Sequence, residues 1–170
     1  MKIRLILSNA KNWALGRSGR KIYRGFFHRT AVKGDTSLGE ANYFKNHALV
    51  ASFYKVIDMD GNVIQSVQAK DTEYAVNQLD ENMISLSYEF CGLQGTPLTA
   101  KQIAAFVADV KADPYTKGIA KHRLAIAEIV ARKVSGWANH HDVTLAYPIP
   151  NGHVDGISEK EIAQILKLLG

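Results

Sequence analysis

Two hydrophobic periodicities divide this chain, and their order limits what it can fold into more than any other feature. Apolar segments of strand length dominate residues 1–90, whereas apolar residues at helical spacing dominate the second half. Strands placed before and between helices predict an α/β (mixed) fold, with a central mixed β-sheet flanked by α-helices. We expect strands at residues 3–7, 23–28, 50–58, 62–68, 83–90 and 143–147, and helices at residues 38–49, 99–112, 122–134 and 158–169.

Cap and turn residues fix several of these boundaries. Thr99 and Gln102 form a capping box at the start of one helix, and Ser158 and Glu161 form a second one. The tetrapeptide at residues 58–61 (Asp-Met-Asp-Gly) separates two alternating segments, which predicts a hairpin. The order of strands and helices is therefore supported by local chemistry as well as by periodicity.

Length and composition bound the class of protein. Hydrophobic residues make up 46% and charged residues 22% of the 170 residues, so we expect one globular domain over residues 1–170, and a monomer. The apolar run at residues 3–7 is too short for a membrane span or for the core of a signal peptide, and we expect neither. Cys91 is the one cysteine, which excludes an intrachain disulfide.

Positive charge is concentrated near the N-terminus. Residues 1–34 contain nine Lys or Arg and no acidic residue, whereas residues 35–170 carry 12 basic and 16 acidic side chains. Such a segment suits an anionic wall polymer, a lipid surface or nucleic acid, and the simpler alternative is a solvated face that aids solubility. We expect no nucleic acid partner, because the sequence has no helix-turn-helix, zinc-finger or RNA-binding sheet signature.

Three of the six histidines are candidates for chemistry because of their positions. His28 ends an apolar strand, and His140 and His153 lie in a loop-rich segment that also contains Asp142 and Asp155. Histidine nitrogens with one carboxylate form a common catalytic zinc set, which leaves one position for water or substrate. By spacing alone, a histidine at a strand end is more simply explained by packing or hydrogen bonding.

Glu89 and Cys91 are also candidates. Glu89 lies near the end of a predicted central strand, so it is either a surface residue or a carboxylate that faces a site. Beside a metal, such a carboxylate can act as a general base. Cys91 is a metal ligand, a nucleophile or a buried free thiol, and the buried thiol is the simplest interpretation because the sequence offers no basic partner.

Several short segments stand out by their amino-acid sequence and by their order along the chain. They are residues 27–31 (FHRTA), 52–61 (SFYKVIDMDG), 62–67 (NVIQSV), 84–92 (ISLSYEFCG), 136–143 (GWANHHDV) and 151–156 (NGHVDG). Together they resemble, in the family's own order, the motifs of type 2 N-acetylmuramoyl-L-alanine amidases of the phage endolysin type. The resemblance spans about residues 23–157 and implies the fold of the peptidoglycan-recognition proteins.

This resemblance implies a reaction and a role for each motif residue. Such enzymes use zinc to hydrolyse the amide between muramic acid and L-alanine in bacterial peptidoglycan. The motif match implies that His28, His140 and Asp155 bind the zinc. Glu89 matches the family's catalytic acid/base, and His153 matches the basic residue that stabilises the transition state. An endolysin would wait in the host cytoplasm and then act on the cell wall, with the basic N-terminal segment as a contact for anionic wall polymers.

Departures from the family pattern leave a second interpretation open. The segment before His153 is a few residues longer than usual, and its residues 144–150 are a candidate lid or specificity loop. Another register would place Tyr147 at the second ligand position. Because tyrosine is a poor zinc ligand at neutral pH, that register predicts a non-catalytic peptidoglycan-binding protein on the same fold. Asn139 also replaces the glycine that usually precedes the second ligand.

Other residues have a simple and a functional interpretation. Asp142 either orients a ligand histidine or caps a loop. Four aromatic residues either stack on sugar or peptide or pack in the core, and packing is the simpler interpretation for each: Trp13, Tyr54, Tyr74 and Trp137.

Overall fold

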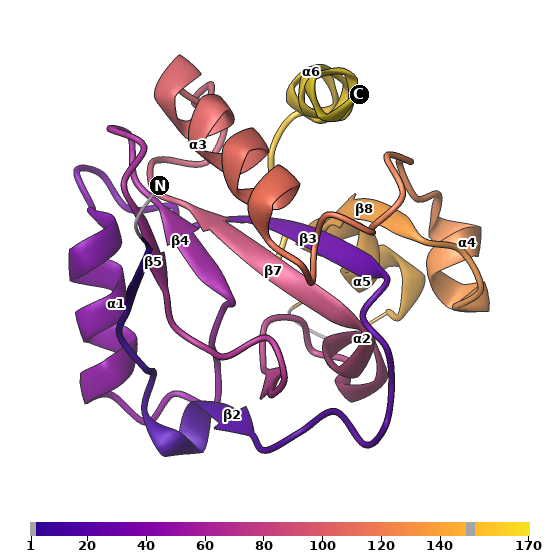
Figure 1. Ribbon diagram of the computed structural model, residues 1–170, viewed down its shortest axis with the longest axis horizontal. Helices are drawn as coiled ribbons and strands as arrows, with labels where there is room; N and C mark the ends of the chain where they lie inside the picture. The colour runs from indigo at the N-terminus through magenta and orange to yellow at the C-terminus, as the bar shows by residue number, and fades with distance from the viewer. Residues whose placement is uncertain (1–2, 149–151) are drawn as a thin grey trace.

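A computed structural model describes residues 3–148 and 152–170. Its centre is a six-stranded sheet with the strand order β1-β5-β4-β7-β3-β8 (Figure 1). β4 and β5 run antiparallel and the other four neighbouring pairs run parallel, so the sheet is mixed, as the sequence predicts. The strands are β1 (Arg4–Leu5), β3 (Arg24–Arg29), β4 (Lys55–Ile57), β5 (Val63–Gln65), β7 (Ser85–Phe90) and β8 (Gly136–Asn139).

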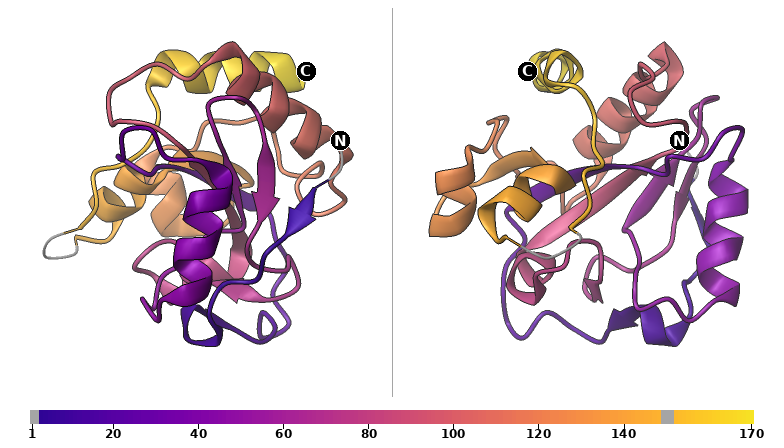
Figure 2. Two further views of the ribbon diagram at one scale, coloured as in Figure 1. Left: turned by 90° about the vertical axis from the view of Figure 1, so that its left-hand side faces the viewer. Right: turned by 180° about the vertical axis from the view of Figure 1, so that it is seen from behind.

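Helices cover both faces of this sheet. α3 and α6 lie beside each other over one face, and α1, α4 and α5 pack against the other (Figures 1 and 2). A short ribbon pairs β2 (Trp13–Ala14) with β6 (Thr72–Glu73), just after a 3-10 turn, η1 (Ala10–Asn12). The helices are α1 (Ser37–Asn46), α2 (Leu79–Ile84), α3 (Ala100–Ala112), α4 (Ile126–Ala131), α5 (His140–Ala146) and α6 (Glu159–Leu169).

Alternation along β3 divides the core between the two helix layers. Phe27 stacks on Trp137 beneath α3 and α6, whereas Phe26 faces α4 and α5. Successive side chains of a strand point to opposite faces, so His28 lies on the same face as Phe26. All six residues of β3 are buried, and the packed strand therefore fixes the position of His28 at its end.

The predicted hairpin and both predicted capping boxes are confirmed. Oδ1 of Asp58 accepts a hydrogen bond from the backbone N–H of Asn62 at 3.0 Å, and Gly61 has a φ of +83°, a conformation that glycine tolerates. This turn joins β4 to β5. Thr99 caps α3 and Ser158 caps α6, each in a complete capping box.

The prediction of a short strand at residues 143–147 is wrong. These residues form most of α5 and its C-cap. The first turn of α5 is fixed by Asp142, whose Oδ2 accepts a hydrogen bond from the backbone N–H of Asn139 at 2.7 Å. A five-residue segment is too short for hydrophobic periodicity to separate helix from strand.

The helix expected at residues 122–134 is shorter than predicted. α4 ends before Arg132, which has a left-handed φ of 52°. Before α4, the backbone N–H of Leu124 donates to the carbonyl of Trp137 at 2.9 Å, so this stretch is extended beside β8. β8 and α2 were not predicted, because each is too short to show a period of its own.

The expected basic N-terminal face is smaller than the charge count suggests. Arg17, Arg24 and Arg29 are buried and bind partners inside the protein. Arg24, for example, pairs with the buried carboxylate of Glu81 at 2.7 Å. Within residues 3–148 and 152–170, no helix has the length and apolar character needed to cross a bilayer.

Candidate active site

Three separate elements bring His28, His140 and Asp155 together. His28 lies at the end of β3, and His140 is the first residue of α5, directly after β8. β3 and β8 pair in parallel, so their carboxyl ends meet at one edge of the sheet. Asp155 reaches the same place from the loop that leads into α6.

The three side chains offer ligand atoms that converge on one point. Nδ1 of His28 lies 3.1 Å from Oδ2 of Asp155, and Nδ1 of His140 lies 2.8 Å from Oδ1 of the same carboxylate. The ligand atoms all lie within 4.8 Å of one another, and both histidines are buried. Two imidazole nitrogens and a carboxylate oxygen are a donor set that zinc prefers, so the residues present fit a zinc ion.

The charges of this group suit a cation. Burial works against the ionised form of Asp155, but its contacts with His140 and His28 outweigh this and hold the pKa of Asp155 well below its ordinary value. Burial lowers the pKa of His140, although Asp155 opposes the shift. An ionised carboxylate and a neutral imidazole are the forms that bind metals.

Glu89 lies beside this group, on the neighbouring strand. In the parallel register of β3 and β7, Glu89 stands directly opposite His28. Its side chain lines the same cavity as His28 and forms no hydrogen bond within the described part of the chain. Burial, and then the nearby charge of Asp155, raise the pKa of Glu89 well above its ordinary value. The position suits a group that exchanges a proton with a ligand in the cavity.

His153 lies at the rim of the site. It is exposed, and its ring stacks on that of His140 with the ring centroids 5.2 Å apart. Oγ1 of Thr144 donates to the backbone carbonyl of His153 at 2.9 Å, which ties this loop to α5. Residues 149–150 of the expected lid, and Asn151 of the last motif, lie outside the described residues.

The cavity in front of these residues has a volume of about 630 Å³. One wall is formed by α1, through Glu40, Tyr43 and Phe44, and another by the segments that carry Phe53 and Tyr74. Sequence reasoning did not single out Glu40, Tyr43 or Phe44. Their spacing of three and four residues places them on one face of a helix, but nothing in the sequence shows that this face borders a cavity.

Tyr147 lies away from the candidate metal ligands. Its hydroxyl donates to Oε1 of Glu81 at 3.0 Å, and the Arg132 guanidinium lies over its ring. His140 instead stands beside His28, with the ring centroids 4.7 Å apart. His140, and not Tyr147, is therefore the residue that lies beside His28 and Asp155.

Of the other sequence candidates, Tyr74 lines the cavity, whereas Cys91, Trp137, Tyr54 and Asp142 do not. Cys91 is buried, and burial raises the pKa of its thiol, which suits an inert side chain. Trp137 is fully buried in the core, and Tyr54 faces the opposite side of β4 from the cavity. Asp142 caps α5 and also pairs with Arg123 at 2.9 Å.

The sequence matches one protein-family model over residues 18–153, and the model describes N-acetylmuramoyl-L-alanine amidases. The match includes His28, Glu89 and His140 and extends over most of the chain. The chain belongs to the N-acetylmuramoyl-L-alanine amidase family. Among curated protein sequences, none matches it.

Several solved structures have the same fold, among them an endolysin described as an N-acetylmuramoyl-L-alanine amidase. The Staphylococcus aureus hydrolase AmiA, crystallised with its ligand, has a TM-score of 0.71 at 16% identity, with 99% of this chain and 83% of that chain covered. The endolysin LysCS from Clostridium intestinale has a TM-score of 0.60 at 14% identity, with 98% and 95% covered. PlyL has a TM-score of 0.61 at 17% identity, with 97% of each chain covered.

Proposed function

We propose that this protein is a zinc-dependent N-acetylmuramoyl-L-alanine amidase. Its reaction is hydrolysis of the amide that joins the lactyl group of muramic acid to L-alanine in bacterial peptidoglycan. One observation carries the proposal: in a member of this family, two buried histidines and a carboxylate converge at a cavity beside an unpaired glutamate. The family match supports the substrate, and the donor set supports the metal.

His28, His140 and Asp155 are the residues that would hold the zinc. A zinc ion there supplies Lewis acidity to water and to the scissile carbonyl. Asp155 keeps its negative charge in this environment and offsets part of the ion's charge. Both imidazoles are buried, at the end of β3 and at the start of α5, so packing holds them in place.

Glu89 and His153 act on the reacting groups in this proposal. Glu89 accepts a proton from the attacking water and later donates it to the amine of L-alanine as the C–N bond breaks. The products are a lactyl carboxylate and a peptide ammonium group, which together account for the atoms and the zero net charge of the amide and one water. His153, at the rim, donates a hydrogen bond to the carbonyl oxygen as that oxygen becomes negative.

The position of Tyr147 bears on the alternative of a non-catalytic binding protein. That alternative depends on Tyr147 as the second ligand, and Tyr147 binds Glu81 instead. We therefore keep the catalytic function as the proposal. The endolysin-type motifs of the sequence support a phage enzyme that is made in the host cytoplasm and acts on the cell wall.

The substitution Glu89→Gln tests the role of the glutamate. It removes the proton acceptor but keeps the size of the side chain, so we expect one zinc per chain and a loss of hydrolysis of at least about 100-fold. Release of free L-alanine amino groups from purified peptidoglycan measures the reaction. Asp60→Asn, which removes an exposed carboxylate on the hairpin turn, is the control and should keep wild-type activity. Wild-type activity in Glu89→Gln would refute the assigned role.

A further inference from the structure

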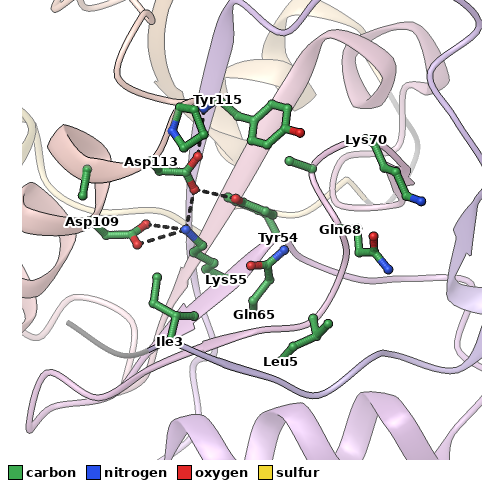
Figure 3. A pocket seen from close by; sticks show the side chains of 13 residues that line it. Ile3, Leu5, Tyr54, Lys55, Gln65, Gln68, Lys70, Asp109, Asp113 and Tyr115 are labelled. Carbon is green, nitrogen blue, oxygen red and sulfur yellow. Dashed lines mark hydrogen bonds and ion pairs between the residues drawn. The ribbon is translucent and has the colours of Figure 1, made fainter.

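A second cavity lies on the opposite side of β4 from the candidate active site. Ser52 and Phe53 line the first cavity, whereas Tyr54 and Lys55 line the second (Figure 3). The second cavity has a volume of about 540 Å³. This lies within the range of roughly 300–1,000 Å³ that is typical of small-molecule sites.

The floor of this cavity is a closed network of charged groups. Nζ of Lys55 donates to both carboxylate oxygens of Asp109 at 2.9 Å and to Oδ2 of Asp113 at 2.5 Å, which uses all three of its N–H groups. The hydroxyls of Tyr54 and Tyr88 donate to the same two carboxylates. The network therefore holds its side chains rigidly.

The rim of the cavity has polar groups that bind nothing within the described part of the chain. These are the side-chain amide of Gln68, the ammonium of Lys70 and the hydroxyl of Tyr115 (Figure 3). Tyr115 as a whole is 49% exposed. An amide both donates and accepts hydrogen bonds, and an exposed ring offers a flat apolar face. Ile3 and Leu5 add an apolar wall. A ligand rich in hydroxyls and amides, with some apolar surface, matches this combination.

A neighbouring cavity extends the site in one direction. It shares Ala69, Lys70, Pro114 and Tyr115 with the second cavity, and it adds Lys21 and Arg20. Arg20 already pairs with Asp80 at 2.7 Å. The two cavities therefore adjoin and together form a longer groove, which we call the Tyr115 groove and which carries the exposed cations Lys21 and Lys70. An elongated groove suits a linear polymer, and exposed cations suit carboxylates on that polymer.

We propose that the Tyr115 groove binds a linear glycan of N-acetylated sugars that carries free carboxylates. Tyr115 stacks on a sugar ring, Gln68 binds hydroxyls, and Ile3 and Leu5 contact acetamido methyl groups. Lys21 and Lys70 pair with the carboxylates of the glycan. The source of that glycan rests on the proposed function: hydrolysis of each lactyl–alanine amide leaves one carboxylate on the muramic acid. The groove thus retains the glycan product outside the catalytic cavity.

Binding of peptide-free glycan strands to the full-length protein tests this proposal. The strands contain no lactyl–alanine amide, so turnover does not interfere with calorimetry. Tyr115→Ala should weaken binding by about tenfold, the scale of one lost aromatic contact. The double variant Lys21→Gln/Lys70→Gln should abolish the preference for these strands over chitotetraose, an N-acetylated glycan without carboxylates. Lys167→Gln, an exposed lysine on α6 that lines neither cavity, is the matched control and should bind like the wild type.

The outcomes separate the groove from the catalytic cavity. Tyr43 is as exposed as Tyr115 and lines the catalytic cavity, so Tyr43→Ala reports on glycan that binds there instead of in the Tyr115 groove. Loss of binding in Tyr43→Ala but not in Tyr115→Ala would place the glycan in the catalytic cavity and overturn the proposal. Absence of strand binding by the wild type would also overturn it. Hydrolysis of a small soluble muropeptide is measured separately. If the protein does not hydrolyse it but still binds strands in a way that depends on Tyr115, the proposed function is refuted and the groove assignment stands.

Discussion

At the scale of single residues, three carboxylates show how burial and partners set charge in this protein. Asp155 contacts two histidine rings, and its pKa is held below the ordinary value. Glu89 forms no side-chain hydrogen bond within the described part of the chain, and burial raises its pKa. Glu73 is fully buried, neither of its oxygens has a hydrogen-bond partner within the described part of the chain, and burial raises its pKa to about 8 although the charge of Arg17 opposes the shift.

The raised pKa of Glu73 predicts a pH-dependent stability. Its ordinary pKa is 4.5 and its folded-state pKa is about 8, so the folded protein holds this proton more tightly than the unfolded chain does. The stabilising contribution is therefore complete below pH 4.5 and is lost as the pH rises through about 8. Relative to Glu73→Gln, the free energy of unfolding of the wild type should fall by a few kcal/mol over this window. Chemical denaturation at a series of pH values measures it, and parallel pH profiles for the two proteins would contradict the expectation.

Sequence motifs located the residues of the candidate metal site but not the walls around it. His28, Glu89 and His140 each lie in a short motif of consecutive residues. The sequence therefore identifies them without knowledge of the fold. Glu40 and Tyr43 line the cavity because α1 packs beside it, and that depends on contacts between distant segments. Such contacts have no local pattern.

At the scale of elements, the pairing of β3 with β8 positions the two histidines. Gly25 lies opposite Trp137 in this register, and the indole ring occupies the space that a side chain at position 25 would take. A Cβ atom at Gly25 would lie 2.2 Å from Cε3 of Trp137. The glycine therefore allows the largest side chain of the core to lie flat on β3.

This close approach predicts a cost for Gly25→Ala. The added methyl group must displace Trp137, and overpacking of this kind reduces the free energy of unfolding by about 1–3 kcal/mol. Chemical denaturation measures the change. Gly118→Ala is the matched control, because a Cβ atom there meets no atom within 4 Å, and it should change stability little. Equal stabilities of the two variants would show that the core accommodates the methyl group without strain.

The sequence predicted some turns and helix starts correctly and missed other elements. The hairpin at Asp58 and the capping boxes of α3 and α6 rest on side chains that bind their own neighbours in the chain, and all three were predicted correctly. β8 and α5 were missed because both are short and are stabilised by their partners: β8 pairs with β3, and α5 packs against α4.

At the scale of the whole molecule, the sheet separates two cavities that face different directions. The candidate active site lies at the carboxyl ends of β3 and β7, and the Tyr115 groove lies behind β4. Periodicity predicted a mixed sheet between helices but not the strand order, which depends on pairings between distant segments such as β1 with β5. That order places β3 between β7 and β8, so that His28 stands between Glu89 and His140.

The central claim is that His28, His140 and Asp155 form a zinc site, and zinc content per chain tests it most directly. The protein is reloaded with zinc, loosely bound metal is removed, and the bound metal is measured. We expect about one zinc per chain in the wild type and in Tyr147→Phe, and none in His140→Ala, because His140 supplies a ligand atom and Tyr147 binds Glu81. Absence of tightly bound zinc in the wild type, or its retention in His140→Ala, would contradict the account.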